Sequence, residues 1–76
     1  MKSPKIGMTV KYTHNWLKSV GADKSLADMI GEIKEIRKIP TIGKFYCRVL
    51  WNTGEYYGVL NTNLAEVKDG NLIDLE

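Results

Sequence analysis

Residues 43–60 read GKFYCRVLW, NTG and EYYGVL in succession, and this stretch decides the fold. Apolar residues occupy every second position of its first part, at Phe45, Cys47, Val49 and Trp51. A period of two is typical of a strand with one buried face. The NTG triplet predicts a three-residue hairpin turn in which Gly54 takes a positive φ. Residues 56–60 are then expected to return as the partner strand.

The chain before this hairpin predicts two further strands and a helical excursion. Residues 8–12 alternate in the same way, with Gly7 in front of them. Residues 14–29 form a long excursion in which Thr13 can cap a short helical turn and Gly21 can end it. We expect the excursion to fold over an open end of the sheet through four apolar anchors: Trp16, Leu17, Leu26 and Met29.

The second strand is predicted over residues 30–39, although the spacing of its apolar residues alone does not favour a strand. Its isoleucines recur every three residues, which favours a helix, but isoleucine is β-branched and Pro40 follows directly. A bulge near Lys34 and Glu35 would reconcile this spacing with a strand. After the hairpin, residues 61–63 predict a tight turn and residues 64–67 a last short strand, which Asp69-Gly70 breaks.

The order of these segments resembles a known small fold. A glycine before the first strand, a long first loop, IGEI at residues 30–33, RVLWNTG at 48–54 and NLAEV at 63–67 follow one another. The order resembles that of the five-stranded SH3-like barrels of the KOW-like and Mind-bomb-like kind, which also occur in small phage and bacterial mobile-element proteins. The sharpest part of the resemblance is Val49-x-Trp51-x-x-Gly54.

The resemblance implies a mainly β fold: a small five-stranded SH3-like barrel over residues 6–67, with a short helical excursion between strands 1 and 2. A flexible arm over residues 1–5 and a tail over residues 68–76 flank it. The tail carries Leu72, Ile73 and Leu75, so it either packs back or stays free. Barrels of this kind bind RNA, DNA, peptides or other proteins, so the fold alone selects no function.

Composition narrows the class of protein. Seventy-six residues are expected to form one small domain, and the single cysteine excludes an internal disulfide. Residues 1–8 lack the apolar stretch of a signal peptide, and no segment is long enough to cross a bilayer, so we expect a cytoplasmic protein. The net charge is +2, with ten of the eleven basic residues before residue 49 and a net charge of −4 over residues 49–76.

No pattern in the chain predicts catalysis, a cofactor or a metal site. His14 is the only histidine and has no neighbouring nucleophile or orienting carboxylate in the sequence. Cys47 occupies the inward register of the strongest strand, where a small buried side chain is expected. One cysteine and one histidine show no zinc-ligand spacing. We therefore expect a protein that is not an enzyme.

The aromatic residues are the strongest candidates for a binding surface in this sequence. Tyr46 and Tyr56 fall in the outward register of the central hairpin next to Arg48, whereas Tyr57 is expected to point inward with Val59. The candidate binding residues are Tyr46, Arg48 and Tyr56, followed by Lys11, Lys44 and Trp16. Such a surface suits a protein interface. The alternatives are nucleic-acid binding by the same residues, self-association through an edge strand, and a second core edge covered by these tyrosines.

Overall fold

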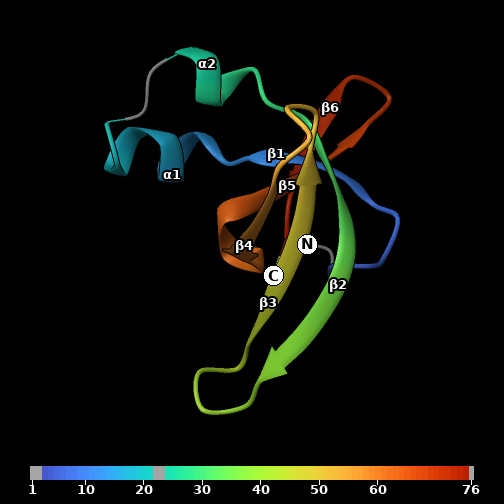
Figure 1. Ribbon diagram of the computed structural model, residues 1–76. Helices are drawn as coiled ribbons and strands as arrows, with labels where there is room; N and C mark the ends of the chain where they lie inside the picture. The colour runs from blue at the N-terminus through green and yellow to red at the C-terminus, as the bar shows by residue number, and fades with distance from the viewer. Residues whose placement is uncertain (1–2, 22–23, 76) are drawn as a thin grey trace.

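A computed structural model describes residues 3–21 and 24–75, and it places all the strands in one sheet (Figure 1). The elements in chain order are β1 (Thr9–Tyr12), α1 (His14–Ser19), α2 (Lys24–Ala27), β2 (Gly31–Ile39), β3 (Lys44–Trp51), β4 (Tyr56–Leu60), the 3₁₀ turn η1 (Asn61–Asn63), β5 (Leu64–Lys68) and β6 (Asn71–Asp74).

The six strands pair in the order β4-β3-β2-β1-β5-β6, and every pair is antiparallel. The predicted central hairpin is confirmed as β3 and β4, and Gly54 in its turn has a φ of 87°. Among the described residues, β4 and β6 do not pair, so the sheet has two free edges. The prediction of five strands is wrong by one, because β6 extends the sheet beyond β5.

The predicted bulge lies within β2. Ile33 pairs with Val49, whereas Glu35 pairs with Arg48, so Lys34 is the extra residue. A bulge of this kind reverses which face the following residues occupy. Ile33 before it and Ile36 after it therefore both face the core, although they are three residues apart. This is why the isoleucine spacing imitates a helix in a chain that forms a strand.

A stack of three aromatic rings fastens the helical excursion to the sheet. The Trp16 and Tyr12 ring centroids are 4.2 Å apart, and those of Tyr12 and Trp51 are 4.4 Å apart. Trp51, only 1% exposed, is the largest side chain of the core. Gly31 makes room for it, since a Cβ at residue 31 would lie 2.8 Å from Trp51 Cε3.

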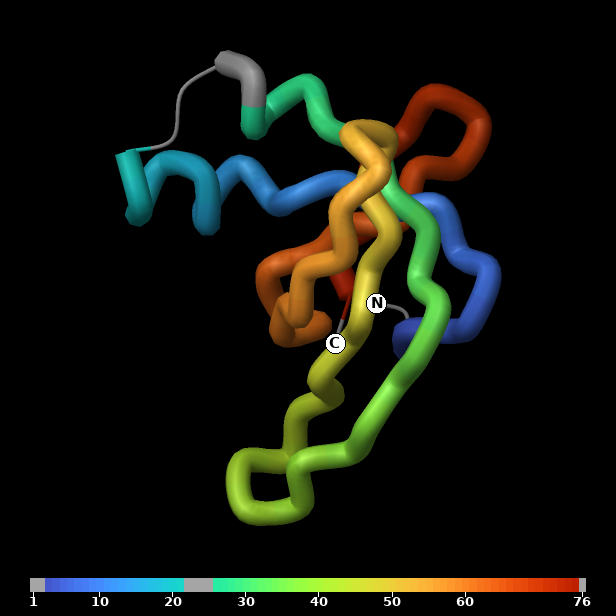
Figure 2. The backbone as a smooth tube through the Cα atoms, in the orientation of Figure 1, coloured from blue at the N-terminus to red at the C-terminus, as the bar shows by residue number. Residues whose placement is uncertain are grey.

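The excursion begins as predicted. The Thr13 hydroxyl accepts a hydrogen bond from the Trp16 N–H at 3.2 Å and caps α1, and Gly21 follows α1 with a φ of 63°. Met29 is buried, and the other three anchors, Trp16, Leu17 and Leu26, are half-buried against the core. Figures 1 and 2 show α1 and α2 together at one side of the sheet, beyond the end of β1.

Both ends of the described chain contact the sheet. Of the expected arm over residues 1–5, Met1 and Lys2 lie outside the described residues, and Pro4 is buried. The Gly7 N–H donates to the Ile33 carbonyl oxygen at 2.8 Å. In the tail, Asp69 and Gly70 have positive φ values and form the turn into β6, and Leu75 behind β6 is buried.

We expect Trp51→Ala to lower the free energy of unfolding by about 3–5 kcal/mol, because it removes the largest side chain of the core and the ring against which Tyr12 stacks. A domain of this size has a stability of the same order, so the variant should be largely unfolded. Urea denaturation followed by circular dichroism measures the change. An unchanged denaturation midpoint would contradict the position of Trp51 in the core.

Candidate functional site

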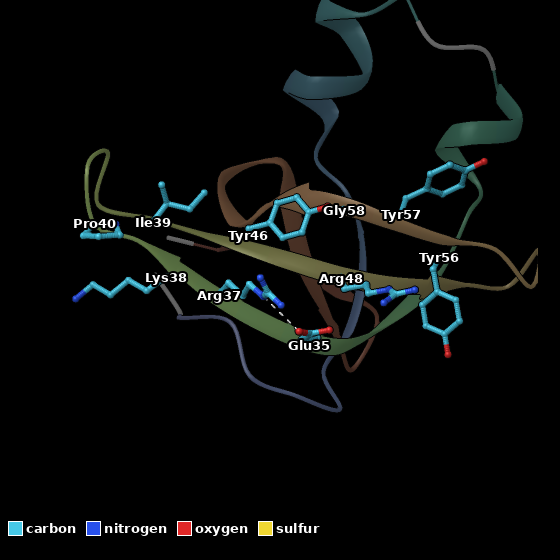
Figure 3. Close-up of a pocket in the computed structure, with 10 residues that line it drawn as sticks. All are labelled: Glu35, Arg37, Lys38, Ile39, Pro40, Tyr46, Arg48, Tyr56, Tyr57 and Gly58. Atoms are coloured by element: carbon cyan, nitrogen blue, oxygen red, sulfur yellow. Dashed lines mark hydrogen bonds and ion pairs between the residues drawn. The ribbon is translucent and has the colours of Figure 1, made fainter.

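Three of the six predicted binding residues line one groove on the face of the sheet opposite the core. Tyr46 and Arg48 come from β3, and Tyr56 comes from β4. The groove has a volume of about 640 Å³ and is called the outer groove below (Figure 3). Its other lining residues are Glu35, Arg37, Lys38, Ile39, Pro40, Tyr57 and Gly58.

The alternation of β3 places these side chains on the outer face. Cys47, Val49 and Trp51 are buried on the core side, so the residues between them point the other way. Tyr46 is 43% exposed and Tyr56 is 49% exposed. The alternative in which these tyrosines cover a second core edge is therefore wrong.

Some of the charged side chains in the outer groove already contact other groups of the groove. The Arg48 guanidinium carbon lies 4.7 Å from the centre of the Tyr56 ring, within the range of a cation–π contact. Arg37 Nε lies 3.4 Å from a carboxylate oxygen of Glu35. Figure 3 shows Lys38 extending away from these groups toward the β2–β3 turn. Three cations against one anion leave the groove positive.

Gly58 shapes the groove by having no side chain. The Tyr46 ring lies across Gly58 on the neighbouring strand, and a Cβ at residue 58 would collide with the hydroxyl end of that ring. Figure 3 shows the Tyr46 ring directly beside Gly58. The glycine thus lets the tyrosine lie flat along β4.

Tyr57 is placed differently from the prediction. It has the inward register, opposite Val49, yet it is 46% exposed because β4 is an edge strand, to which no further strand of the described residues pairs. Its hydroxyl donates to a carboxylate oxygen of Glu55 at 2.8 Å, and this hydrogen bond raises the pKa of Tyr57. The prediction that Tyr57 points inward holds for its register and fails for its burial.

Trp16 lines a second groove on the core side of β4. This groove, called the inner groove below, has a volume of about 560 Å³ and lies between β4 and the excursion. It is lined mainly by apolar and aromatic side chains. Its lining residues are Tyr12, Trp16, Leu26, Met29, Tyr46, Thr53, Glu55, Tyr57, Gly58, Val59, Leu60 and Asn63.

The two predicted lysines lie outside both grooves. Lys11 is on β1 opposite Ala65, and Lys44 begins β3 opposite Ile39 at the base of the turn. Sequence reasoning missed Glu35, Arg37 and Gly58 as lining residues. The signal for the first two was the bulge itself, because every second residue after Lys34 turns to the outer face.

The potentially reactive side chains have structural surroundings. Cys47 is fully buried, and burial raises the pKa of its thiol from 9.0 to about 11. His14 is exposed as the first residue of α1. The described residues include no group of three or more potential metal ligands among His, Cys, Asp and Glu. The buried Cys47 thiol is therefore a poor nucleophile.

Comparison with known proteins gives no match: no family model, no curated protein and no solved structure is significantly similar to this chain. In the part of the chain that the structure describes, no helix has the length and apolar character needed to cross a membrane.

We expect Gly58→Ala to move the Tyr46 ring off β4 while changing the free energy of unfolding by only about 0.5 kcal/mol, because the displaced end of the ring is exposed. Nuclear Overhauser contacts between the Tyr46 ring and the residue 58 backbone measure the ring position. Unchanged contacts in the variant would show that the ring does not cross β4.

We expect the Cys47 thiol of the native protein to react with Ellman's reagent at pH 8 at least about a hundredfold more slowly than in urea, since only the thiolate reacts.

We also expect the free energy of unfolding to fall as pH rises from about 9 to 11. In this window the unfolded thiol loses its proton and the native thiol keeps it, so the unfolded state binds fewer protons.

The control for the pH dependence is Cys47→Ala, which should show a shallower decline over the same pH window. Tyr12 contributes a decline of the same sign in both proteins, because burial raises its pKa above 10.0. Identical slopes for the two proteins, or equal thiol reactivity in the native and unfolded states, would contradict the burial of Cys47.

Proposed function

We propose that this protein is a non-catalytic interaction module that binds a protein partner through the outer groove. One observation carries the proposal: Tyr46, Arg48 and Tyr56 gather on the face away from the core, and both tyrosines remain more than two-fifths exposed. Tyrosine and arginine are the side chains that most often dominate protein interfaces. Here they contribute little to the core, so their exposed surface is available to a partner.

The mixed chemistry of the outer groove supports a protein over a nucleic acid. Ile39 and Pro40 add apolar surface at one end, and Glu35 places a carboxylate next to Arg37. A surface that follows a phosphate backbone is more uniformly basic. Nucleic-acid binding stays the second candidate, because Arg37, Lys38 and Arg48 line the same groove as two exposed tyrosine rings on which bases could stack.

We also propose that the fold is a variant of the SH3-like barrel, with β6 added to it, and that the protein is cytoplasmic. The strand order β4-β3-β2-β1-β5, the long excursion after β1 and the 3₁₀ turn between β4 and β5 support the fold. Self-association through a free edge strand would be an alternative use of the same module.

We expect Tyr46→Ala combined with Arg48→Ala to abolish capture of a protein partner from cell extract while leaving the melting temperature nearly unchanged, since both side chains are exposed. The immobilised wild-type protein, this double variant and a control are compared after nuclease treatment of the extract. The control is Lys68→Ala combined with Leu72→Ala, two exposed residues near the opposite edge of the sheet.

Equal capture by wild-type protein and the groove variant would overturn the proposal. Capture that nuclease abolishes, together with salt-sensitive binding to random single-stranded oligonucleotides, would replace the protein partner with a nucleic acid. A large drop in melting temperature would show that Tyr46 and Arg48 support the fold.

A further inference from the structure

We propose that an extended segment of the protein partner pairs with β4 as an additional strand, and that this segment directs an acidic residue to the outer groove and the apolar residues beside it to the inner groove. The inference rests on the proposed function and specifies the partner's chemistry. It also uses the inner groove and the free edge of β4, neither of which the proposed function requires.

The backbone of β4 offers free hydrogen-bonding groups at its outer edge. The Trp51 N–H donates to the Glu55 carbonyl oxygen at 2.9 Å, which makes these opposite residues a hydrogen-bonded pair. Bonded and non-bonded pairs alternate in an antiparallel ladder, so Tyr57 bonds to Val49, and Tyr56 and Gly58 turn their backbone groups away from β3. Within the described residues, no recorded hydrogen bond occupies these outward groups.

The two grooves lie on opposite faces of this same edge. Tyr46, Tyr57 and Gly58 line both of them. A strand added at an edge projects its side chains alternately to the two faces of the sheet. One set of partner side chains would therefore enter the outer groove, and the set between them would enter the inner groove.

The lining of each groove determines the chemistry of each set. Arg48 lies on β3, one strand in from the free edge of β4, whereas Arg37 on β2 already pairs with Glu35; Arg48 is thus the cation that a carboxylate on the added strand would meet. The inner groove presents Trp16, Leu26 and other apolar side chains, which suit valine, leucine or isoleucine. The matching segment thus carries an acid at the position that faces Arg48, and apolar residues on either side of this acid enter the inner groove.

A second copy of this chain is a poor occupant of the site. Its β4 reads YYGVL and has no acid to face Arg48. Its acidic stretch with apolar neighbours, residues 69–75, already pairs with β5 through β6, so docking it would require breaking that hairpin. The structure therefore points to a different chain.

The test titrates the full protein with end-capped peptides and follows backbone amide shifts by NMR. The first peptide alternates glutamate and valine, the second has the same composition with all glutamates grouped first, and the third replaces glutamate with lysine. We expect the alternating peptide to shift residues lining both grooves and to slow hydrogen exchange at the Tyr56 and Gly58 amides. The other two peptides should bind at least about tenfold more weakly.

Backbone methylation of the alternating peptide tests strand pairing directly, because it leaves the side chains in place. Methylation of every second amide should weaken binding at least about tenfold in one of the two frames and much less in the other. Two variants on the outer face of β4 test the charge preference: the glutamate peptide should bind Tyr56→Glu several-fold more weakly than Tyr56→Lys, with a gap that narrows as salt is added.

Equal effects of both methylation frames, or shifts confined to the outer groove, would overturn strand pairing. If Tyr46 and Arg48 are nevertheless needed for protein capture, the proposed function stands without it. Absence of binding by the alternating peptide at millimolar concentration also overturns the inference. Exchange protection of Tyr56 and Gly58 that grows with protein concentration alone would assign β4 to a second copy. Strand pairing without any role for Tyr46 and Arg48 in capture would reject the proposed function alone.

Discussion

The stacking of Trp16, Tyr12 and Trp51 is the interaction on which the rest of the structure depends. These rings come from α1, β1 and β3, so a single stack joins the excursion, the first strand and the central hairpin. α1 and α2 are too short to be stable in isolation, and helices of this length form only when packing holds them. Without Gly31, the Trp51 ring would have no room beside β2. The wall of the inner groove opposite β4 therefore exists because the stack exists.

The same constraint explains why the outer groove is available for binding. All the large core side chains of β3 lie on one face, so Tyr46 and Arg48 are left on the other with no layer to cover them. A small domain has only enough apolar surface for one core, and in this chain the core lies on the face of the sheet that the excursion covers. The strand register thus places the exposed tyrosines of β3 and β4 on the surface. Gly58 has no side chain, so the Tyr46 ring can lie against β4.

Local rules predicted most of the sheet but less of the site. Period-two alternation defined β3, the turn residues defined the hairpin, and the conflict between β-branched residues and three-residue spacing located the bulge at Lys34. What failed depended on which strands become neighbours. The pairing of β6 with β5 and the exposure of Tyr57 at an edge are decided by strand order, which no local pattern encodes. The positive charge of Lys11 suggested that it belongs to the binding surface of the hairpin. In the strand order, however, β2 lies between β1 and β3.

The extra residue in β2 makes the composition of the binding face sensitive to chain length. Beyond Lys34, Glu35 and Arg37 face solvent and Ile36 faces the core only because one position is skipped. A deletion of a single codon there would exchange the two sets, so that a salt-bridged pair would enter the apolar interior and an isoleucine would enter the groove. Evolution can therefore change the lining of the groove by substitution, whereas an insertion or deletion within β2 would move its residues to the wrong faces of the sheet.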